Sequence, residues 1–130
     1  MSAMTNYMEK AVTNHFFRNT ATTSPVAVYL AMYESAPGED GSGTEASYTN
    51  YTRVVSTWSE ANEAGEIYNT GSIVFPANGD AGDVTLTHAA VFDAVAGGNM
   101  LIKGVLSVPK TIQSSDVIAV GDGQLKLTFD

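Results

Sequence analysis

The chain has 130 residues, of which 44% are hydrophobic, enough to fold as one domain, residues 1–130, around its own core. Six Lys and Arg against fourteen Asp and Glu give a formal charge of −8, which excludes nucleic acid as an expected partner because its phosphates would be repelled. The sequence contains no cysteine, so disulfides and thiolate metal sites are excluded as well.

Residues 4–18 have the spacing of an amphipathic helix, with apolar side chains recurring at Met4, Met8 and Phe16. Phe16 and Phe17 would point about 100° apart on a helix, so they cannot share one narrow stripe. We expect one of them to pack on the body of the protein and the other to meet another chain, with Met4 and Met8 as further interface candidates. The alternative is a helix half sunk in its own core.

The beginning of the chain shows no basic segment leading into an apolar run, so we expect no secretory signal. No uncharged apolar run approaches the roughly 20 residues that cross a bilayer, so we expect no membrane insertion.

From residue 25 onward the apolar period changes to two, which is typical of strands, as in VAVYLAMY at 26–33. Further strand candidates, separated by clusters of Gly, Asn, Asp and Pro, are residues 51–58, 67–75, 84–95, 100–108, 116–120 and 124–129. Short strands with a single helix at one end cannot make βαβ units. The sequence therefore predicts a mainly β fold: an antiparallel β-sandwich or flattened barrel of about seven to eight strands over 25–130, with one N-terminal α-helix.

A Gly-rich acidic stretch at 34–50 connects two of the predicted strands. A phosphate cradle is disfavoured because no Lys lies near its glycines and a strand follows it. Calcium has weak candidate ligands in Glu39, Asp40 and Glu45, although their order does not match the helix-loop-helix calcium pattern. We favour a long exposed connection that touches a partner. The aromatic residues in or beside it that would stack on a sugar or a protein surface are Tyr48, Tyr51 and Trp58.

The only imidazoles belong to His15 and His88, and no nucleophile elbow or metal-ligand pair accompanies them. No spacing rule brings two of the fourteen carboxylates together as a hydrolytic pair. We therefore expect no enzyme activity, no catalytic residues, no bound metal and no cofactor. A hydrolase acting on a cell-surface polymer is the enzymatic alternative, and only the abundance of acids supports it.

Three segments carry a family resemblance: the strand that runs into the acidic loop (29–45), HAAVFDA followed by GGN (88–99), and GVLSVPKTI (104–112). In this order they resemble a family of small tailed-bacteriophage virion proteins commonly called phage tail fibre proteins. The similarity runs from about residue 4 to 130, nearly the entire chain. No catalytic residues are transferred by it.

The resemblance implies a bacteriophage structural protein, made in the host cytoplasm and located in the virion among other virion proteins. We expect a tail-associated module, in the tail fibre or tail tip, that assembles as a symmetric homo-oligomer such as a trimer and contacts the host surface. One alternative is a capsid decoration (cement) protein that stabilises the phage head. The other is a carbohydrate- or receptor-binding module that holds a host glycan with a calcium-assisted loop.

Overall fold

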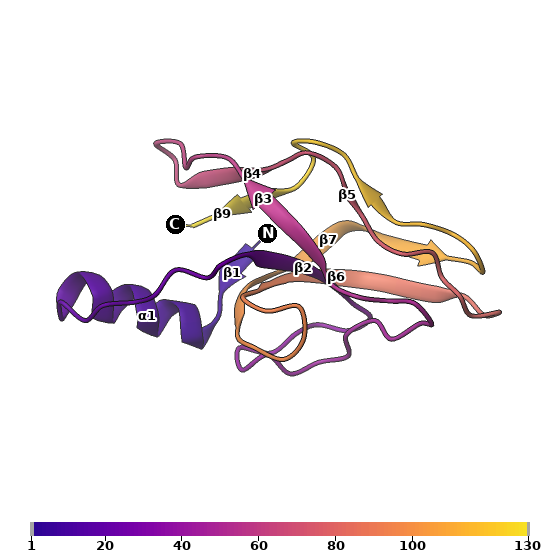
Figure 1. The fold of residues 1–130 in the computed structure, drawn as a ribbon, viewed down its shortest axis with the longest axis horizontal. Coiled ribbons are helices and arrows are strands. Elements are labelled where there is room, and N and C mark those ends of the chain that lie inside the picture. The colour runs from indigo at the N-terminus through magenta and orange to yellow at the C-terminus, as the bar shows by residue number, and fades with distance from the viewer. Residues whose placement is uncertain (1, 130) are drawn as a thin grey trace.

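The computed structural model describes residues 2–129 and consists of a curled antiparallel sheet with one helix projecting from it (Figure 1). The elements in chain order are β1 (Ser2–Met4), α1 (Asn6–Phe17), β2 (Val28–Tyr33), β3 (Val54–Trp58), β4 (Glu66–Thr70), β5 (Ile73–Val74), β6 (Val84–Phe92), β7 (Met100–Ile112), β8 (Ala119–Val120) and β9 (Lys126–Thr128). The predicted fold class is confirmed: mainly β, barrel-like and antiparallel, with one helix near the N-terminus.

The main sheet has seven strands in the order β1-β7-β6-β2-β3-β4-β9, and β5 and β8 form a separate two-stranded sheet. All pairs are antiparallel, and the longest registers join β6 to β7 and to β2, where Tyr29 pairs with Phe92 and Tyr33 with His88. The two edge strands, β1 and β9, contact each other without pairing, so the sheet nearly closes into a barrel.

The strand β2 is buried on both faces because its side chains alternate between two clusters. Leu30 and Met32 belong to the main core, which continues through Phe75 and Leu86 between the two sheets. Ala31 and Tyr33 point the other way, into the second cluster; that cluster also contains Ala90, Phe92 and Met100. The period-two pattern read at 26–33 therefore describes a strand whose two faces are both apolar.

Several element boundaries differ from the sequence prediction. The strand expected at 67–75 is split into β4 and β5 at Gly71, whose φ of +76° breaks the extended backbone. The strand expected at 100–108 continues through Pro109 to residue 112. The helix begins at Asn6 because Thr5 caps it, and β1 before it was not predicted. The acidic stretch connects β2 to β3 as expected.

Candidate interaction surfaces

The helix α1 and the segment 18–27 that runs back from it to β2 project together from one end of the barrel, and we call residues 6–27 the arm (Figure 1). Thr5 anchors its base: its hydroxyl donates to the Met100 carbonyl over 2.5 Å and accepts from the N–H of Met8. No residue of α1 is buried, although the helix contacts β1 and β7 at its base. The arm is therefore held at one end and exposed along its length.

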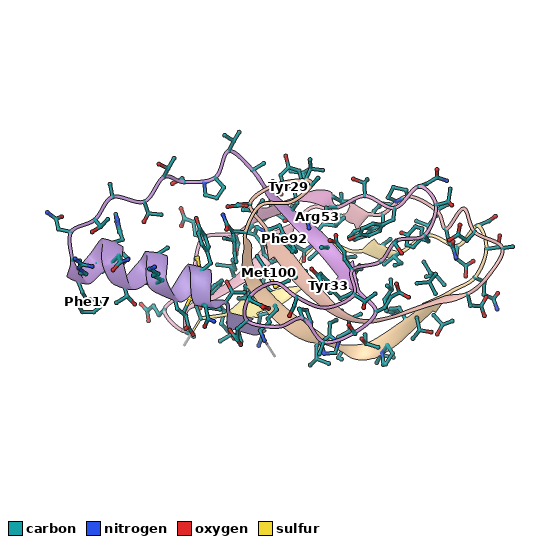
Figure 2. The ribbon with its side chains drawn as sticks, turned by 90° about the horizontal axis from the view of Figure 1, so that it is seen from below. Phe17, Tyr29, Tyr33, Arg53, Phe92 and Met100 are labelled. Carbon is teal, nitrogen blue, oxygen red and sulfur yellow. The ribbon has the colours of Figure 1, made fainter. Side chains whose placement is uncertain are left out.

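Large apolar side chains are exposed on the arm. Phe16 is 74% exposed and Phe17, at its tip, is 84% exposed (Figure 2). Neither packs on the barrel, contrary to the expectation that one of them would, because α1 points away from the sheet. Between α1 and the returning segment lies an open cleft of about 590 Å³, lined by residues that include Tyr7, Met8, Val12 and Pro25. Met4, the remaining methionine predicted at an interface, is half-buried in β1.

Arg53 joins the acidic loop to the loop between β6 and β7. Its Nε and Nη2 atoms donate to the two carboxylate oxygens of Glu45, each over 2.9 Å. Its Nη1 atom donates to the carbonyls of Ala94 and Gly97, at 3.0 and 2.8 Å. The Arg53 side chain is only 9% exposed, so three of these bonds are partly buried, while the bond to Gly97 lies at the surface.

Two aromatic rings complete this arrangement, which we call the Arg53 clamp: Arg53, Glu45, Tyr51 and Phe92. The guanidinium lies over the Phe92 ring, 3.5 Å from its centroid (Figure 2). The Tyr51 hydroxyl donates to Glu45 over 2.8 Å and accepts from the N–H of Met32 over 3.1 Å. The clamp therefore connects β2, the acidic loop, the start of β3 and the end of β6.

The electrostatics of the clamp follow from burial and charge pairing. Burial by itself would lower the pKa of the Arg53 guanidinium, but the hydrogen bonds and attraction of Glu45 outweigh burial and raise it. Burial raises the pKa of the Tyr51 phenol, and the Glu45 carboxylate adds to that increase. The clamp therefore keeps a cation, a carboxylate and a neutral phenol together, which is a structural rather than a reactive combination.

The three acids named as calcium candidates have separate partners. Glu39 pairs with Lys103 over 2.9 Å, and Glu45 belongs to the clamp. Asp40 accepts from the N–H of Ser42 over 3.0 Å, and its hydrogen bonds with Ser42 lower its pKa. Within residues 2–129, no group of three or more His, Asp or Glu side chains gathers as a metal site would require.

The aromatic residues predicted to stack on a partner are placed differently. Tyr48 is 4% exposed and its hydroxyl donates to the Pro76 carbonyl, while the Tyr51 ring lies parallel to that of Phe75. Trp58 is half-buried, with its indole N–H bonded to a neighbouring serine hydroxyl. Tyr48 and Tyr51 do not present their rings to a partner, because the loop folds back and places both rings against the core.

The two histidines lie on different elements, His15 in α1 and His88 in β6. His15 is exposed on the arm, with its ring edge against Phe16, and His88 is half-buried in β6 beside Thr87. Among the described residues, no helix has both the length and the apolarity to span a bilayer.

Sequence reasoning missed two features. The local pattern around Arg53 indicates only a strand. Its hydrogen-bond partners lie 8 to 44 residues away in the sequence, so no local signal identifies the clamp. A polar hollow of about 230 Å³ was also missed because it forms where the base of α1 meets two loops; its polar lining residues are Asn6, Tyr7, Glu39, Asp40 and Asn99.

Comparison with known proteins gives one family. The family model described as Podophage GP4 fiber I protein gp80 matches residues 3–128, which is nearly the whole chain. A search of curated proteins found no match.

Proposed function

The chain belongs to the Podophage GP4 fiber I protein gp80 family, and from this premise we propose that it is a tail-associated fibre module whose copies assemble symmetrically through the arm. Membership supports a structural component of the virion, and the role proposed here requires no catalysis. The observation that carries the assembly is the arm itself, an exposed helix whose aromatic side chains are largely in water.

The arm is poorly stabilised by its own contacts. α1 has 12 residues, and isolated helices shorter than about 12–15 residues are marginal in water, so helical stability has to come from packing. Yet none of its residues is buried within the chain. A partner that covers the arm would supply the missing contact.

The exposed aromatic residues of the arm supply part of the area that such a contact requires. Tyr7, Phe16 and Phe17 are 45%, 74% and 84% exposed, which at about 200 Å² per aromatic side chain leaves about 400 Å² of apolar surface in water. A stable interface buries about 800 Å² on each partner. Three side chains would thus provide about half of one partner's share.

The test is the mass of the purified protein in solution, by light scattering or native mass spectrometry. We expect an oligomer, and we expect the double variant Phe16→Ser, Phe17→Ser to be a folded monomer with the wild-type circular dichroism spectrum. Val95→Ser, which changes an exposed valine that is not part of the arm, is the control and should keep the wild-type mass. A wild-type monomer at high concentration would refute assembly through the arm.

Position on the particle needs a separate experiment, because a capsid decoration protein would oligomerise too. Antibody labelling of purified virions, viewed by electron microscopy, should place this chain on the tail. Labels distributed over the head would instead support the capsid alternative.

A second candidate function is contact with a host-surface sugar at the polar hollow. Tyr7 provides an exposed ring, and the side chains of Asp40 and Asn99 provide polar atoms around it, a combination that binds sugar faces and hydroxyls. Asp40→Asn should reduce binding to a host glycan several-fold, whereas Glu34→Gln, an exposed acid of the same loop outside the hollow, should not. Equal binding by both variants would remove the hollow, and repeating the titration with and without calcium tests the calcium-assisted version.

A further inference from the structure

An apolar groove of about 750 Å³ lies along the seam between β7 and the segment that contains β8. Its apolar lining residues are Met32, Val105, Leu106, Val108, Ile118, Ala119, Val120 and Leu125. Met32 and Ile118 are buried residues of the main core, so the floor of this groove is formed by the main core itself. We call this the β7 groove.

The groove exists because the barrel does not close along the second half of β7. On one side, β1 pairs with β7 only as far as Gly104. On the other side, β6 pairs through Leu86 with Lys110 and through His88 with Val105, so residues 106–109 of β7 bulge out opposite a single residue of β6. No strand in the described part of the chain pairs with the outer edge of this bulge.

The bulge places apolar side chains in water. Val105 is 53% exposed and Val108 is 62% exposed, beside a groove whose lining is mostly apolar. Contiguous exposed apolar surface of this kind marks a contact site in a soluble protein. These valines belong to the segment 104–112, and packing in the core does not account for their exposed apolar side chains.

The arm of the same chain does not reach this groove. Figure 1 shows α1 projecting beyond one end of the barrel, whereas β8 and the far half of β7 extend toward the other. The base of α1 is held beside the first residues of β7 by Thr5. Phe17, at the tip of the arm, therefore lies away from the groove and is free to enter that of another copy (Figure 2).

We infer that the β7 groove receives the arm tip of a second copy, so that copies join head to tail. This inference rests on the proposed function, since it names the surface on which the arm docks. The donor is the pair Phe16 and Phe17, and the acceptor is the apolar recess around Val108. Such a contact is heterologous, because each copy inserts its arm tip into one neighbour and binds the arm tip of another in its groove. The series of contacts then closes into a ring or continues as a filament.

Charge favours an arm-to-body contact over a body-to-body contact. The arm carries two cations, Lys10 and Arg18, against the single acid Glu9, whereas the rest of the chain has four cations and thirteen acids. Within residues 2–129 no ion pair involves either arm cation. Two bodies of like charge repel each other, and an intervening arm of opposite sign reduces that repulsion. The charged residues that line the groove are Lys110 and Lys126, so the groove accepts the apolar tip, and the arm cations have to lie outside it, over the acidic remainder of the body.

The test uses two variants that damage opposite halves of the same contact. Phe17→Ser removes the tip and keeps the groove, while Val108→Asp places a charge in the groove and keeps the tip. Each variant alone should be monomeric by light scattering. Mixed in equal amounts, they should form a 1:1 heterodimer and nothing larger, because only one intact tip faces one intact groove.

A control variant and a cross-linking experiment distinguish loss of the contact from misfolding of the variants. Val95→Asp adds the same charge at an exposed valine outside the groove and should assemble as wild type. Because the chain has no cysteine, Arg18→Cys beside the tip and Ser107→Cys in the groove lining, which leave both aromatic residues and the apolar recess intact, can be mixed under oxidising conditions, and we expect the mixed disulfide to form in excess over either homodimer.

The outcomes separate the two proposals. A monomeric wild type would overturn the assembly proposed above and this inference with it. An oligomeric wild type in which Phe17→Ser disrupts assembly but Val108→Asp does not would overturn only this inference, since the arm would then dock elsewhere. Random disulfide pairing of the two cysteine variants would overturn it as well.

Discussion

Replacing Arg53 with methionine should destabilise the protein more than removing any other cation. The change preserves the bulk of the side chain but removes its charge and its four hydrogen bonds, two to Glu45 and two to the carbonyls of Ala94 and Gly97. It also removes the cation over the Phe92 ring. Glu45 would lose its cationic partner and keep only the hydrogen bond from the Tyr51 hydroxyl.

The expected loss of stability depends on how far the Arg53–Glu45 ion pair is excluded from water. Removing one partner of a buried ion pair costs about 3–5 kcal/mol. Arg53 is 9% exposed but Glu45 is 25% exposed, so the abandoned carboxylate keeps part of its hydration and we expect the low end, about 3 kcal/mol. Arg53→Lys keeps the charge but cannot make the forked contact and both carbonyl bonds, so at about 1 kcal/mol per lost bond it should cost about 2 kcal/mol.

The assay is urea unfolding, combined with amide hydrogen exchange in the acidic loop. The N–H of Ala46 donates to the Met32 carbonyl and that of Glu34 to Thr44, and both should exchange faster in Arg53→Met. Lys126→Met is the matched control: it breaks the more exposed pair with Glu66, which solvent screens, and should cost much less than Arg53→Met. If Arg53→Met costs no more than this control, or leaves loop exchange unchanged, the clamp does not hold the loop.

Three further predictions concern local features. Thr5→Ala should cost about 2 kcal/mol in urea unfolding, because it removes the helix cap and the partner of a buried carbonyl, while Thr5→Ser should lose less than half of that. Gly65→Ala should destabilise by at least about 1 kcal/mol more than Gly71→Ala in thermal melts, since both have positive φ but only at Gly65 would a Cβ lie 2.7 Å from a backbone oxygen; equal costs would contradict this. The free energy of unfolding should fall as the pH rises above about 10, because burial raises the pKa of three tyrosines in the folded state. Their neutral form therefore stabilises the fold, fully below the pKa of tyrosine in the unfolded chain, and this stabilisation is lost as the pH rises through the higher pKa of the folded state. Phenolate absorbance should show delayed ionisation of Tyr33, Tyr48 and Tyr51.

The elements that sequence predicted well are those whose signal is local. The alternation at 26–33 marked β2 because a strand presents successive side chains to opposite faces, whether or not its partners are known. β1 escaped prediction because it has three residues, and its pairing with Ile102, Lys103 and Gly104 spans almost the whole chain. β5 and β8, with two residues each, are defined only by pairing with each other.

The candidate site residues show the limit of composition as a guide. Tyrosine serves equally in a core and on a binding surface, and the sequence around Tyr48 and Tyr51 did not distinguish these roles. The fold did, because the loop is drawn back by Glu45 toward Arg53 and its tyrosines are carried into the core. The helical spacing placed Phe16 and Phe17 on different stripes and led to the prediction that one of them would pack on the body. Both are exposed, because their exposure depends on where α1 leaves the barrel.

A head-to-tail contact also reconciles a small module with membership of a fibre family. The barrel formed by residues 2–129 has little length of its own, so an extended assembly built from it requires repetition. An isologous contact between two arms would use the same surface on both copies and stop at a dimer. A contact between the arm tip and the β7 groove leaves a free tip at one end and a free groove at the other after every addition. The geometry of one such junction, set by the direction in which α1 leaves the barrel, then decides whether the repeat closes as a ring or extends.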